Sequence, residues 1–363
     1  MIRFYDISKQ DLIIKKKILK SVSKVINNTN FINGKEVFLF EKKFSSFVNS
    51  NYSIACSNGT DALTLALKSL NLKQGSEVIL PGMTYIATLL SIVNLGLKPI
   101  LVDIDNNTGL MNINLIKKKI NKNTKVIMPV HLYGNIFDIR KLKKIVKNEI
   151  FIIEDASQAH GGYFKHTSQK VGSLADLSCF SLYPGKNLGA YGDAGIITTN
   201  NKFLKERIIK LGNLGASRDK KYDHDILGFN NRMDTIQAAV LLEKINLLKF
   251  YNKKRIEIAK KYNKKIKNKK IKLLNYVNGS VYHQYIILTN NRKKFQKYML
   301  DSGIQTGIHY PKSICMHKST LKLFKNINTK VSDMFAKKCV SIPIDPCLKA
   351  QEINTIIKKI NSY

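Results

Sequence analysis

The sequence predicts an α/β protein, with a mostly parallel sheet covered by helices on both faces and a smaller α+β unit after it. Two observations support this prediction. Between residues 52 and 199, short apolar runs alternate with helical stretches, and strands that are apolar on both faces are typical of a covered parallel sheet. After Arg232 the alternation ends, and one long helical stretch leads into a region with a different pattern.

The strands expected in the first region are short apolar runs. They are 53–56, 78–80, 100–102, 126–128, 151–153, 177–182 and 196–198. Helical stretches lie between several of them, most clearly over 61–70 and 85–95. Strands that are separated by helices favour a parallel order in one sheet.

The second region begins with a helix that is expected to run from about residue 232 to 267. Its apolar positions recur at helical spacing, at Ile236, Val240, Ile245 and Leu248. A strand over 281–288 and an amphipathic helix over 293–301 follow. We therefore expect a large α/β domain over residues 1–240, and a linking helix with a small α+β domain over 241–363.

The composition excludes several classes of protein. Hydrophobic residues make up 44% of the chain and charged residues 24%, which is ordinary globular usage and excludes a disordered or fibrous chain. The longest apolar runs fall far short of the roughly 18 residues that a membrane helix needs, and the first residues lack a secretory signal pattern. Five cysteines without a C-x-x-C pair favour reduced thiols over disulfides or a metal site, so we expect a cytoplasmic protein.

The net charge is extreme. There are 61 lysines and arginines against 25 aspartates and glutamates, which gives +36 and would suit a nucleic-acid-binding protein. The excess is lysine that is scattered along the whole chain, whereas arginine, which reads guanine and binds phosphate bidentately, is sparse. Nucleic acid is therefore an unlikely partner, and a non-catalytic nucleic-acid-binding regulator is kept only as an alternative.

Functional residues are expected just after the strands, because open α/β sheets bind ligands beyond the carboxyl ends of their strands. The strand at 53–56 is followed by a small, glycine-containing turn that opens a helix, NGTDAL at 58–63. Free backbone N–H groups at such a helix start can hold a phosphate. Alternatively, Thr60 or Asp61 only caps the helix.

Two adjacent carboxylates, Glu154 and Asp155, follow the buried strand at 151–153. Carboxylates at the end of a buried strand are costly without a partner, so one of the two should face a cation. The alternative is a capped turn in which Asp155 or Ser157 bonds the backbone.

A lysine among glycines, Lys186, lies between the apolar runs 177–182 and 196–198. The segment is not a phosphate-binding P-loop, because Asn187 stands where a serine or threonine is required, and its glycines do not match G-x-G-x-x-G. A semi-buried lysine in this setting serves phosphate binding or Schiff-base chemistry, since desolvation lowers its pKa.

Six segments together resemble one family, the DegT/StrS type of nucleotide-sugar aminotransferases, which use pyridoxal 5'-phosphate. In chain order they are FINGKEV (31–37), NGTDAL (58–63), EDASQAHG (154–161), FSLYPGKNLGAYGD (180–193), GFNNRMDTIQAA (228–239) and HYP (309–311). The resemblance implies a fold type I, aspartate aminotransferase-like transferase. It also implies a homodimer with shared active sites.

The resemblance implies a role for several residues. Lys186 corresponds to the catalytic lysine that binds the cofactor as a Schiff base, and Asp155 to the catalytic carboxylate that pairs with the protonated ring nitrogen. The other implied cofactor contacts are Gln158 at the phenolate oxygen, Tyr85 on the ring face, Gly59, Thr60 and Ser181 at the phosphate, and Asn230 from the neighbouring subunit. His160 and His131 are expected to be structural.

The resemblance also implies the reaction. L-glutamate would convert the cofactor to pyridoxamine 5'-phosphate, and a keto sugar on a nucleoside diphosphate would then accept the nitrogen. The loop at 183–189 is most similar to that of members that aminate dTDP-3-keto-6-deoxyhexoses. Amination of 4-keto sugars is the alternative. The product would serve amino sugar biosynthesis for a surface polysaccharide or a glycosylated metabolite. Related dehydratases have another residue in place of the lysine, so the presence of Lys186 argues against dehydratase activity. The implied substrate contacts are Tyr183, Arg218, Lys221, Tyr222, His309 and Tyr310.

Overall fold

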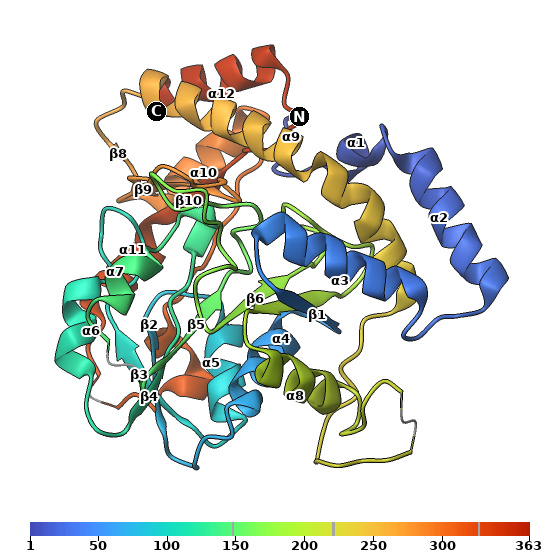
Figure 1. Ribbon diagram of the computed structural model, residues 1–363. Helices are drawn as coiled ribbons and strands as arrows, with labels where there is room; N and C mark the ends of the chain where they lie inside the picture. Colours follow the sequence, from blue (N-terminus) through green and yellow to red (C-terminus); the bar gives the residue numbers. More distant parts are fainter. Residues whose placement is uncertain (147–148, 220–221, 326) are drawn as a thin grey trace.

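A seven-stranded sheet forms the centre of the protein in the computed structural model, which describes residues 1–146, 149–219, 222–325 and 327–363 (Figure 1). The strand order is β1-β7-β6-β5-β4-β2-β3. Neighbouring strands pair in parallel except for β7, which is antiparallel to both β1 and β6. The strands are β1 (Tyr52–Cys56), β2 (Glu77–Pro81), β3 (Lys98–Val102), β4 (Thr124–Ile127), β5 (Phe151–Asp155), β6 (Leu177–Ser181) and β7 (Gly195–Thr199).

Helices cover both faces of this sheet, as its apolar strands require. In β5, Ile152 packs into one apolar cluster and Ile153 into another, because successive side chains point to opposite faces. The Ile153 face is covered by α4 (Gly59–Ser69), α5 (Ile86–Val93) and α8 (Lys202–Gly212). The opposite face is covered by α3 (Lys35–Val48), α6 (Ile113–Lys119), α7 (Ile139–Lys143), part of α9 (Thr235–Lys265) and α11 (Lys330–Lys338).

A second, three-stranded antiparallel sheet has the order β10-β9-β8. Its own apolar cluster contains residues of the second half of α9. The elements of this region are β8 (Ile271–Leu273), β9 (Tyr285–Thr289), α10 (Arg292–Asp301), β10 (Cys339–Ile342) and α12 (Ala350–Ser362). Figure 1 shows α9 running past both regions, and the predicted division at residue 240 falls inside this helix and stays a prediction.

The strand expected over 281–288 begins later, at Tyr285. Tyr282 has a left-handed backbone with φ of 48°, which a strand cannot contain. The N–H of Val281 donates to Gly134 O and the N–H of Gln284 to Tyr133 O, so this stretch binds a loop next to β5 instead of a strand. The predicted start of this strand at residue 281 was therefore wrong, because an apolar run in the sequence does not reveal a bend in the backbone.

Two helices at the start of the chain lie outside the sheet layers. They are α1 (Ile7–Asp11) and α2 (Lys15–Asn28), and Figure 1 shows α2 at the edge of the molecule beside α9 and α3. Ile14 and Ile18 pack against Val240 of α9. Large apolar side chains remain exposed on this part of the chain and the next, at Leu12, Ile13, Leu19, Ile26, Phe31, Ile32, Phe38 and Leu39.

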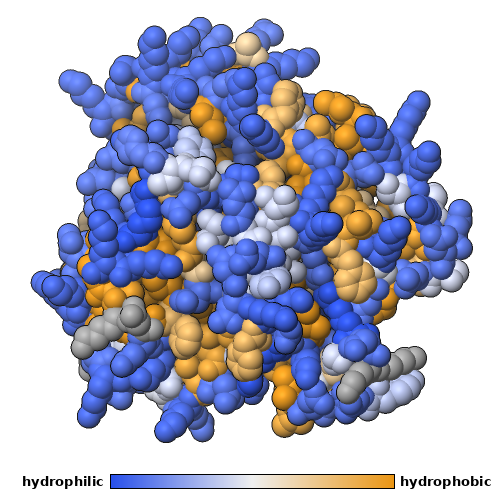
Figure 2. All heavy atoms as spheres, in the orientation of Figure 1, coloured by the Kyte–Doolittle hydropathy of each residue, from blue (hydrophilic) through white to orange (hydrophobic). Residues whose placement is uncertain are grey.

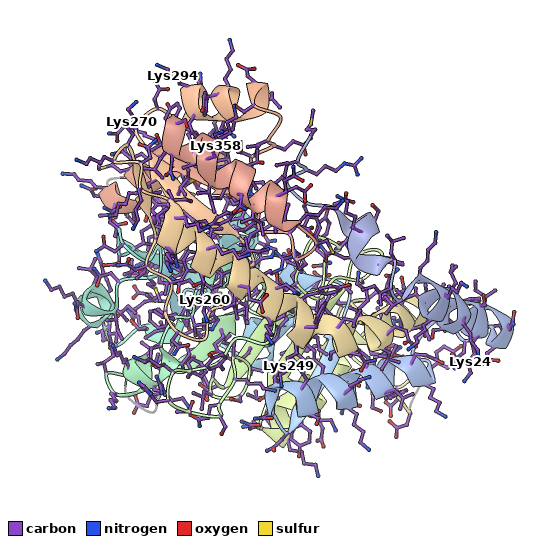
Figure 3. All side chains as sticks on the ribbon, turned by 90° about the horizontal axis from the view of Figure 1, so that it is seen from above. Lys24, Lys249, Lys260, Lys270, Lys294 and Lys358 are labelled. Atoms are coloured by element: carbon purple, nitrogen blue, oxygen red, sulfur yellow. The ribbon has the colours of Figure 1, made fainter. Side chains whose placement is uncertain are left out.

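The lysines are spread over the surface. In Figure 3 the labelled side chains of Lys24, Lys249, Lys260, Lys294 and Lys358 point outward from α2, α9, α10 and α12. Figure 2 shows hydrophilic side chains over most of the visible face, with apolar patches between them. Among the described residues, no helix is long and apolar enough to cross a membrane, and no cluster suits a metal ion.

Candidate active site

A cavity of about 850 Å³ lies where the carboxyl ends of β1, β2, β5 and β6 meet. The loop between β6 and β7, α9, the N-terminal segment and residues 283–284, 309–310 and 344–345 also line it. Most of the site residues predicted from the sequence line it: Gly59, Thr60, Tyr85, Asp155, Gln158, Ser181, Tyr183, Lys186, His309 and Tyr310. The fold therefore brings together segments that are more than 200 residues apart.

The two carboxylates at the end of β5 face opposite sides of the sheet. Asp155 lines the cavity, whereas Glu154 is fully buried behind it. Glu154 accepts hydrogen bonds from Gly172 N at 3.1 Å and from the Ser178 hydroxyl, and lies 3.3 Å from His131 Nε2. Strand alternation thus leaves Asp155 as the carboxylate of this pair that reaches a ligand in the cavity.

Thr88 orients the Asp155 carboxylate, which the sequence analysis missed. The Thr88 hydroxyl donates to Asp155 Oδ2 at 2.8 Å, and Ser157 N donates to Oδ1 at 3.2 Å. Because Thr88 donates to Asp155, it accepts from the Thr84 hydroxyl, 2.8 Å away. Thr88 and Ser91 are both fully buried in α5, whose other residues are apolar, and a buried hydroxyl in such a helix is a sequence signal that both residues share.

Lys186 is presented by a tight loop after β6. Its backbone N–H donates to Tyr183 O at 2.8 Å, and a Cβ at Gly189 would lie 2.4 Å from Pro184 O, so the loop requires glycine there. Across the described ranges, the Lys186 ammonium has neither a hydrogen bond nor an ion pair. Desolvation lowers the pKa of Lys186 to about 8, against the opposing effect of Asp155. A large fraction of this amine is therefore neutral near pH 8, as a nucleophile or base requires.

The start of α4 forms a cradle for an anion. The helix is capped by Asn58, whose side chain accepts from Asp61 N at 2.9 Å, so the cap is neither Thr60 nor Asp61. A Cβ at Gly59 would lie only 2.6 Å from Ser181 Cβ. Glycine thus lets the helix start approach the end of β6, and the N–H groups of the first turn lie beside the Ser181 hydroxyl.

Gln158 links two tyrosines. Its amide oxygen accepts from Tyr133 N, and its Nε2 donates to the Tyr310 hydroxyl at 3.0 Å. The Tyr85 ring lies with its centroid 5.3 Å from that of Tyr310 and is 54% exposed, so it can offer a face to a planar ligand. These side chains form one polar and aromatic side of the cavity.

His309 lies between the N-terminal segment and β10. Its ring stacks on Phe4 with centroids 5.7 Å apart, and Nδ1 lies 2.8 Å from the Ser341 hydroxyl. Burial, and then the charge of Lys186, lower the pKa of His309 to about 4. The His309 imidazole is therefore neutral at physiological pH. Tyr183, whose side chain is 58% exposed, lines the same cavity.

A buried network of hydrogen bonds stabilises the loop that presents Lys186. Asn187 Nδ2 donates to Asn252 Oδ1 and Val281 O, which places its oxygen toward His283 Nδ1 at 3.0 Å. His283 Nδ1 therefore carries the hydrogen, and Nε2 is an acceptor. His283 lines the cavity, and its pKa is lowered well below its usual value by burial and by Lys186. The sequence analysis did not identify His283.

His160 is buried within the fold, where its Nδ1 has no partner among the described residues, and its predicted structural role stays a prediction. Its Nε2 lies 2.8 Å from Ser181 O, and burial lowers its pKa to about 3, with Lys186 as a second cause. Asn252 Nδ2 donates to the carbonyl of His160 at 2.7 Å. His131 is also held within the fold, since its Nδ1 accepts from Phe137 N at 3.0 Å.

Three predicted site residues of the described part of the chain, Arg218, Tyr222 and Asn230, do not line this cavity. The guanidinium of Arg218 forms a bidentate pair with Glu41 of its own chain, at 2.6 and 2.9 Å, and lies over the Phe38 ring. Asn230 is exposed beside Asn213, and Tyr222 is 81% exposed. Lys221 lies outside the described residues. The roles predicted for these residues depend on a neighbouring subunit and stay predictions.

The residues of the cavity fit pyridoxal phosphate. The cradle at Gly59 and Ser181 suits its phosphate, Asp155 suits a protonated ring nitrogen, and Lys186 offers an amine without another partner within the described part of the chain. A planar ring between these groups would lie near Tyr85. The cavity is also larger than the cofactor needs, which leaves space for a substrate.

A comparison with known proteins decides the family. The model of the DegT/DnrJ/EryC1/StrS aminotransferase family matches residues 12–361. The chain belongs to this family. The aminotransferase prediction and the fold prediction are thereby confirmed.

Relatives of this aminotransferase family match along the whole chain. The dTDP-3-amino-3,6-dideoxy-alpha-D-galactopyranose transaminase of Aneurinibacillus thermoaerophilus is 39% identical, over 100% of this chain and 99% of that protein. The UDP-2-acetamido-2-deoxy-3-oxo-D-glucuronate aminotransferase of Pseudomonas aeruginosa is 36% identical, over 98% of each chain. Among solved structures, DesV of S. venezuelae superposes with a TM-score of 0.95 at 29% identity, covering 99% of this chain and 98% of DesV. NtdA of Bacillus subtilis, solved with bound PMP, has a TM-score of 0.89 at 29% identity, covering 95% and 80%.

Proposed function

We propose that this aminotransferase moves an amino group from L-glutamate to a keto sugar that is linked to a nucleoside diphosphate, most specifically a dTDP-3-keto-6-deoxyhexose. One observation carries the proposal: Lys186, an amine with a lowered pKa, lies in the same cavity as Asp155 and the phosphate cradle at Gly59. The product would enter amino sugar biosynthesis for a surface polysaccharide or a glycosylated metabolite. The free thiols Cys56, Cys179 and Cys339 support a reducing, cytoplasmic location.

The cofactor is pyridoxal 5'-phosphate. When bound, it supplies an electron sink for the negative charge that proton removal leaves on a substrate carbon. Asp155 pairs with its ring nitrogen, and the Thr88 hydroxyl holds that carboxylate in place. Gly59, Thr60 and Ser181 hold the phosphate, Tyr85 covers the ring, and Gln158 donates to the phenolate oxygen.

Lys186 moves the proton in both half-reactions. When it is free, the neutral Nζ of Lys186 would accept the proton from the donor Cα. Its lowered pKa keeps a useful fraction neutral near pH 8. The fixed loop between Tyr183 and Gly189 keeps Nζ within reach of the reacting carbons.

The sugar is proposed to bind on the side of Tyr183, His309 and Tyr310. The neutral His309 ring and the two tyrosine hydroxyls offer hydrogen bonds to sugar hydroxyls without repelling a cation. The relative from A. thermoaerophilus supports a dTDP sugar, and the relative from P. aeruginosa, which is named for a UDP sugar, shows that the nucleotide varies in the family. Both names place the nitrogen at the 3 position or on a 3-oxo sugar, which favours the 3-keto position over the 4-keto position.

The test is product identification. The enzyme with pyridoxal phosphate and L-glutamate is incubated separately with dTDP-3-keto-6-deoxy, dTDP-4-keto-6-deoxy and UDP-3-oxo sugars, and each amine is identified by mass spectrometry and NMR. We expect amination of the dTDP-3-keto sugar. Amination of the 4-keto or UDP sugar alone would overturn the substrate assignment, and no amination of any sugar would overturn the proposed function.

The protein is proposed to act as a homodimer with shared active sites. The exposed apolar side chains at the start of the chain, including Leu12, Ile13 and Phe38, support a covered surface there. Asn230, Arg218, Lys221 and Tyr222 would then reach the site of the partner.

Subunit mixing tests the shared site. Lys186→Ala chains and Asn230→Ala chains, each inactive alone, should regain part of the activity when they are mixed, because one site of each hybrid dimer is intact. Subunit exchange is verified by native mass spectrometry with a size-labelled chain. Exchange without recovered activity would show that Asn230 acts within its own subunit.

A further inference from the structure

A second cation, Arg255, lines the cavity that contains Lys186. Arg255 lies in the second half of α9 and is only 2% exposed. Its Nη1 donates to Ile344 O at 3.0 Å, which is its one hydrogen bond to the described part of the chain. Its Nε is buried without any partner there. The guanidinium therefore keeps donors for a ligand.

No carboxylate of the described residues neutralises Arg255 within ion-pair distance. Asp345 is the carboxylate whose charge acts on Arg255, after that of Tyr5, but both of its oxygens accept hydrogen bonds from other groups. Asp345 Oδ2 accepts from Asp6 N and Gln10 Nε2, and Oδ1 accepts from Cys347 N. A buried guanidinium stays charged, and without an anion its burial is costly. An anionic ligand in the cavity would remove that cost.

Arg255 is contributed to the cavity by α9, whereas Asp155 belongs to the end of β5. Ile344 accepts a hydrogen bond from Arg255, and the charges of Tyr5 and Asp345 act on it. The Tyr5 hydroxyl in turn lies 3.5 Å from Pro184 O in the lysine loop. His283 also lies within the electrostatic reach of both Lys186 and Arg255, and it is neutral, so it adds no repulsion to a cationic amino group.

We propose that Arg255 binds a carboxylate of the amino donor and thereby orients the donor amine toward Lys186. This inference rests on the proposed function. A planar guanidinium matches a carboxylate through two parallel hydrogen bonds. The single positive charge of Arg255, with Asp345 nearby, suits a singly charged carboxylate. A diphosphate carries more negative charge than Arg255 can offset. The sugar nucleotide therefore binds elsewhere in the cavity.

The test compares two amino donors. In Arg255→Met and Arg255→Lys, the rate of pyridoxamine phosphate formation from L-glutamate is measured against the rate from benzylamine, which has no carboxylate. We expect kcat/KM for glutamate to fall about 30-fold or more in Arg255→Met, as the loss of a charge-assisted pair implies, with less than a threefold change for benzylamine. Arg255→Lys should recover part of the glutamate rate.

Arg207→Met is the matched control, because the Nε of Arg207 is also buried without a partner but Arg207 does not line the cavity. Arg207→Met should leave the rates with glutamate and with benzylamine unchanged. A second readout is the calorimetric affinity of the cofactor-loaded enzyme for glutarate, an unreactive dicarboxylate, which should weaken in Arg255→Met alone.

Other outcomes overturn the inference. Equal losses for glutamate and benzylamine, or loss of the bound cofactor, would assign Arg255 a structural role. A higher KM for the keto sugar with an unchanged glutamate rate would assign it to the diphosphate. If the wild-type enzyme itself does not react with glutamate but binds glutarate through Arg255, the proposed donor fails and the carboxylate site stands.

Discussion

Single residues at the end of β5 decide which carboxylate meets the ligand. The sequence placed two carboxylates after one apolar run, and the residues alone left open which of them was functional. Resemblance selected Asp155, and the structure gives the physical reason, because Glu154 is turned to the opposite face and satisfied by Gly172 and Ser178. The hydroxyl of Thr88 was a signal within its helix, but its partner Asp155 lies 67 residues away in the chain and could not be read from the sequence.

Asp155→Asn should therefore reduce turnover by two or more orders of magnitude, because an amide cannot offset a positive charge on the ring nitrogen. Thr88→Val should cost about tenfold, the equivalent of one hydrogen bond to a charged group. Single-turnover absorbance with glutamate measures both. Glu154→Gln is the control and should lower stability rather than turnover; a turnover loss in Glu154→Gln equal to that of Asp155→Asn would contradict the assignment.

The amine of Lys186 should make the free energy of unfolding of the cofactor-free protein depend on pH. Its folded pKa of about 8 lies below the usual 10.5, so the unfolded chain binds more protons between these values. The free energy of unfolding should then rise with pH from about 8 to 10.5, by roughly 1–2 kcal/mol after allowance for partial solvent access.

Lys186→Met should remove this rise, and urea denaturation at pH 7.5, 9 and 10 measures it. Lys170, which does not line the cavity, supplies the control variant Lys170→Met. A wild-type stability that is flat over this window would show that Lys186 is not desolvated.

At the scale of elements, the pattern of apolar runs predicted the seven strands of the main sheet and the long helix, because burial on both faces leaves a plain signal. The beginning of β9 was misplaced, since the bend at Tyr282 depends on a loop next to β5. Arg255 lies on the buried face of α9, four residues before Ala259 and seven before Tyr262. A cation at that spacing was a signal in the sequence that could have marked it.

The approach of α4 to β6 gives a prediction for the phosphate cradle. In Gly59→Ala, the added methyl group would meet Ser181 Cβ at 2.6 Å and push the helix start away from the strand end. We expect the dissociation constant of pyridoxal phosphate to rise about tenfold or more, the equivalent of at least 1.4 kcal/mol. Gly212→Ala, where the nearest atoms lie at 3.5 Å, is the control. Equal affinities by absorbance titration would argue against a phosphate at this helix.

At the scale of the whole molecule, buried neutral histidines should make the fold sensitive to acid. Burial lowers the pKa of His160 to about 3 and of His309 to about 4, and that of His283 well below its usual value. The unfolded chain takes up protons at these sites near pH 6.5, so the free energy of unfolding should fall as the pH drops from 6.5 toward 4. Denaturant titrations at pH 7, 6, 5 and 4 measure this.

The double variant His160→Gln, His309→Gln should show a flatter acid profile than the wild type, even if its stability at pH 7 is lower. His166, which is exposed, gives the control His166→Gln with an unchanged profile. A double variant whose stability declines as steeply as that of the wild type would assign the acid sensitivity to other groups.

The cavity is assembled from both ends of the chain. Ile2 bridges to Ile304, Phe4 stacks on His309, and Asp6 N donates to Asp345. During synthesis, residues 2, 4 and 6 therefore lack these partners until residues 304, 309 and 345 have been made. The pocket that would capture the cofactor is consequently complete only once residue 345 has been made, because its lining extends from Phe4 to Asp345.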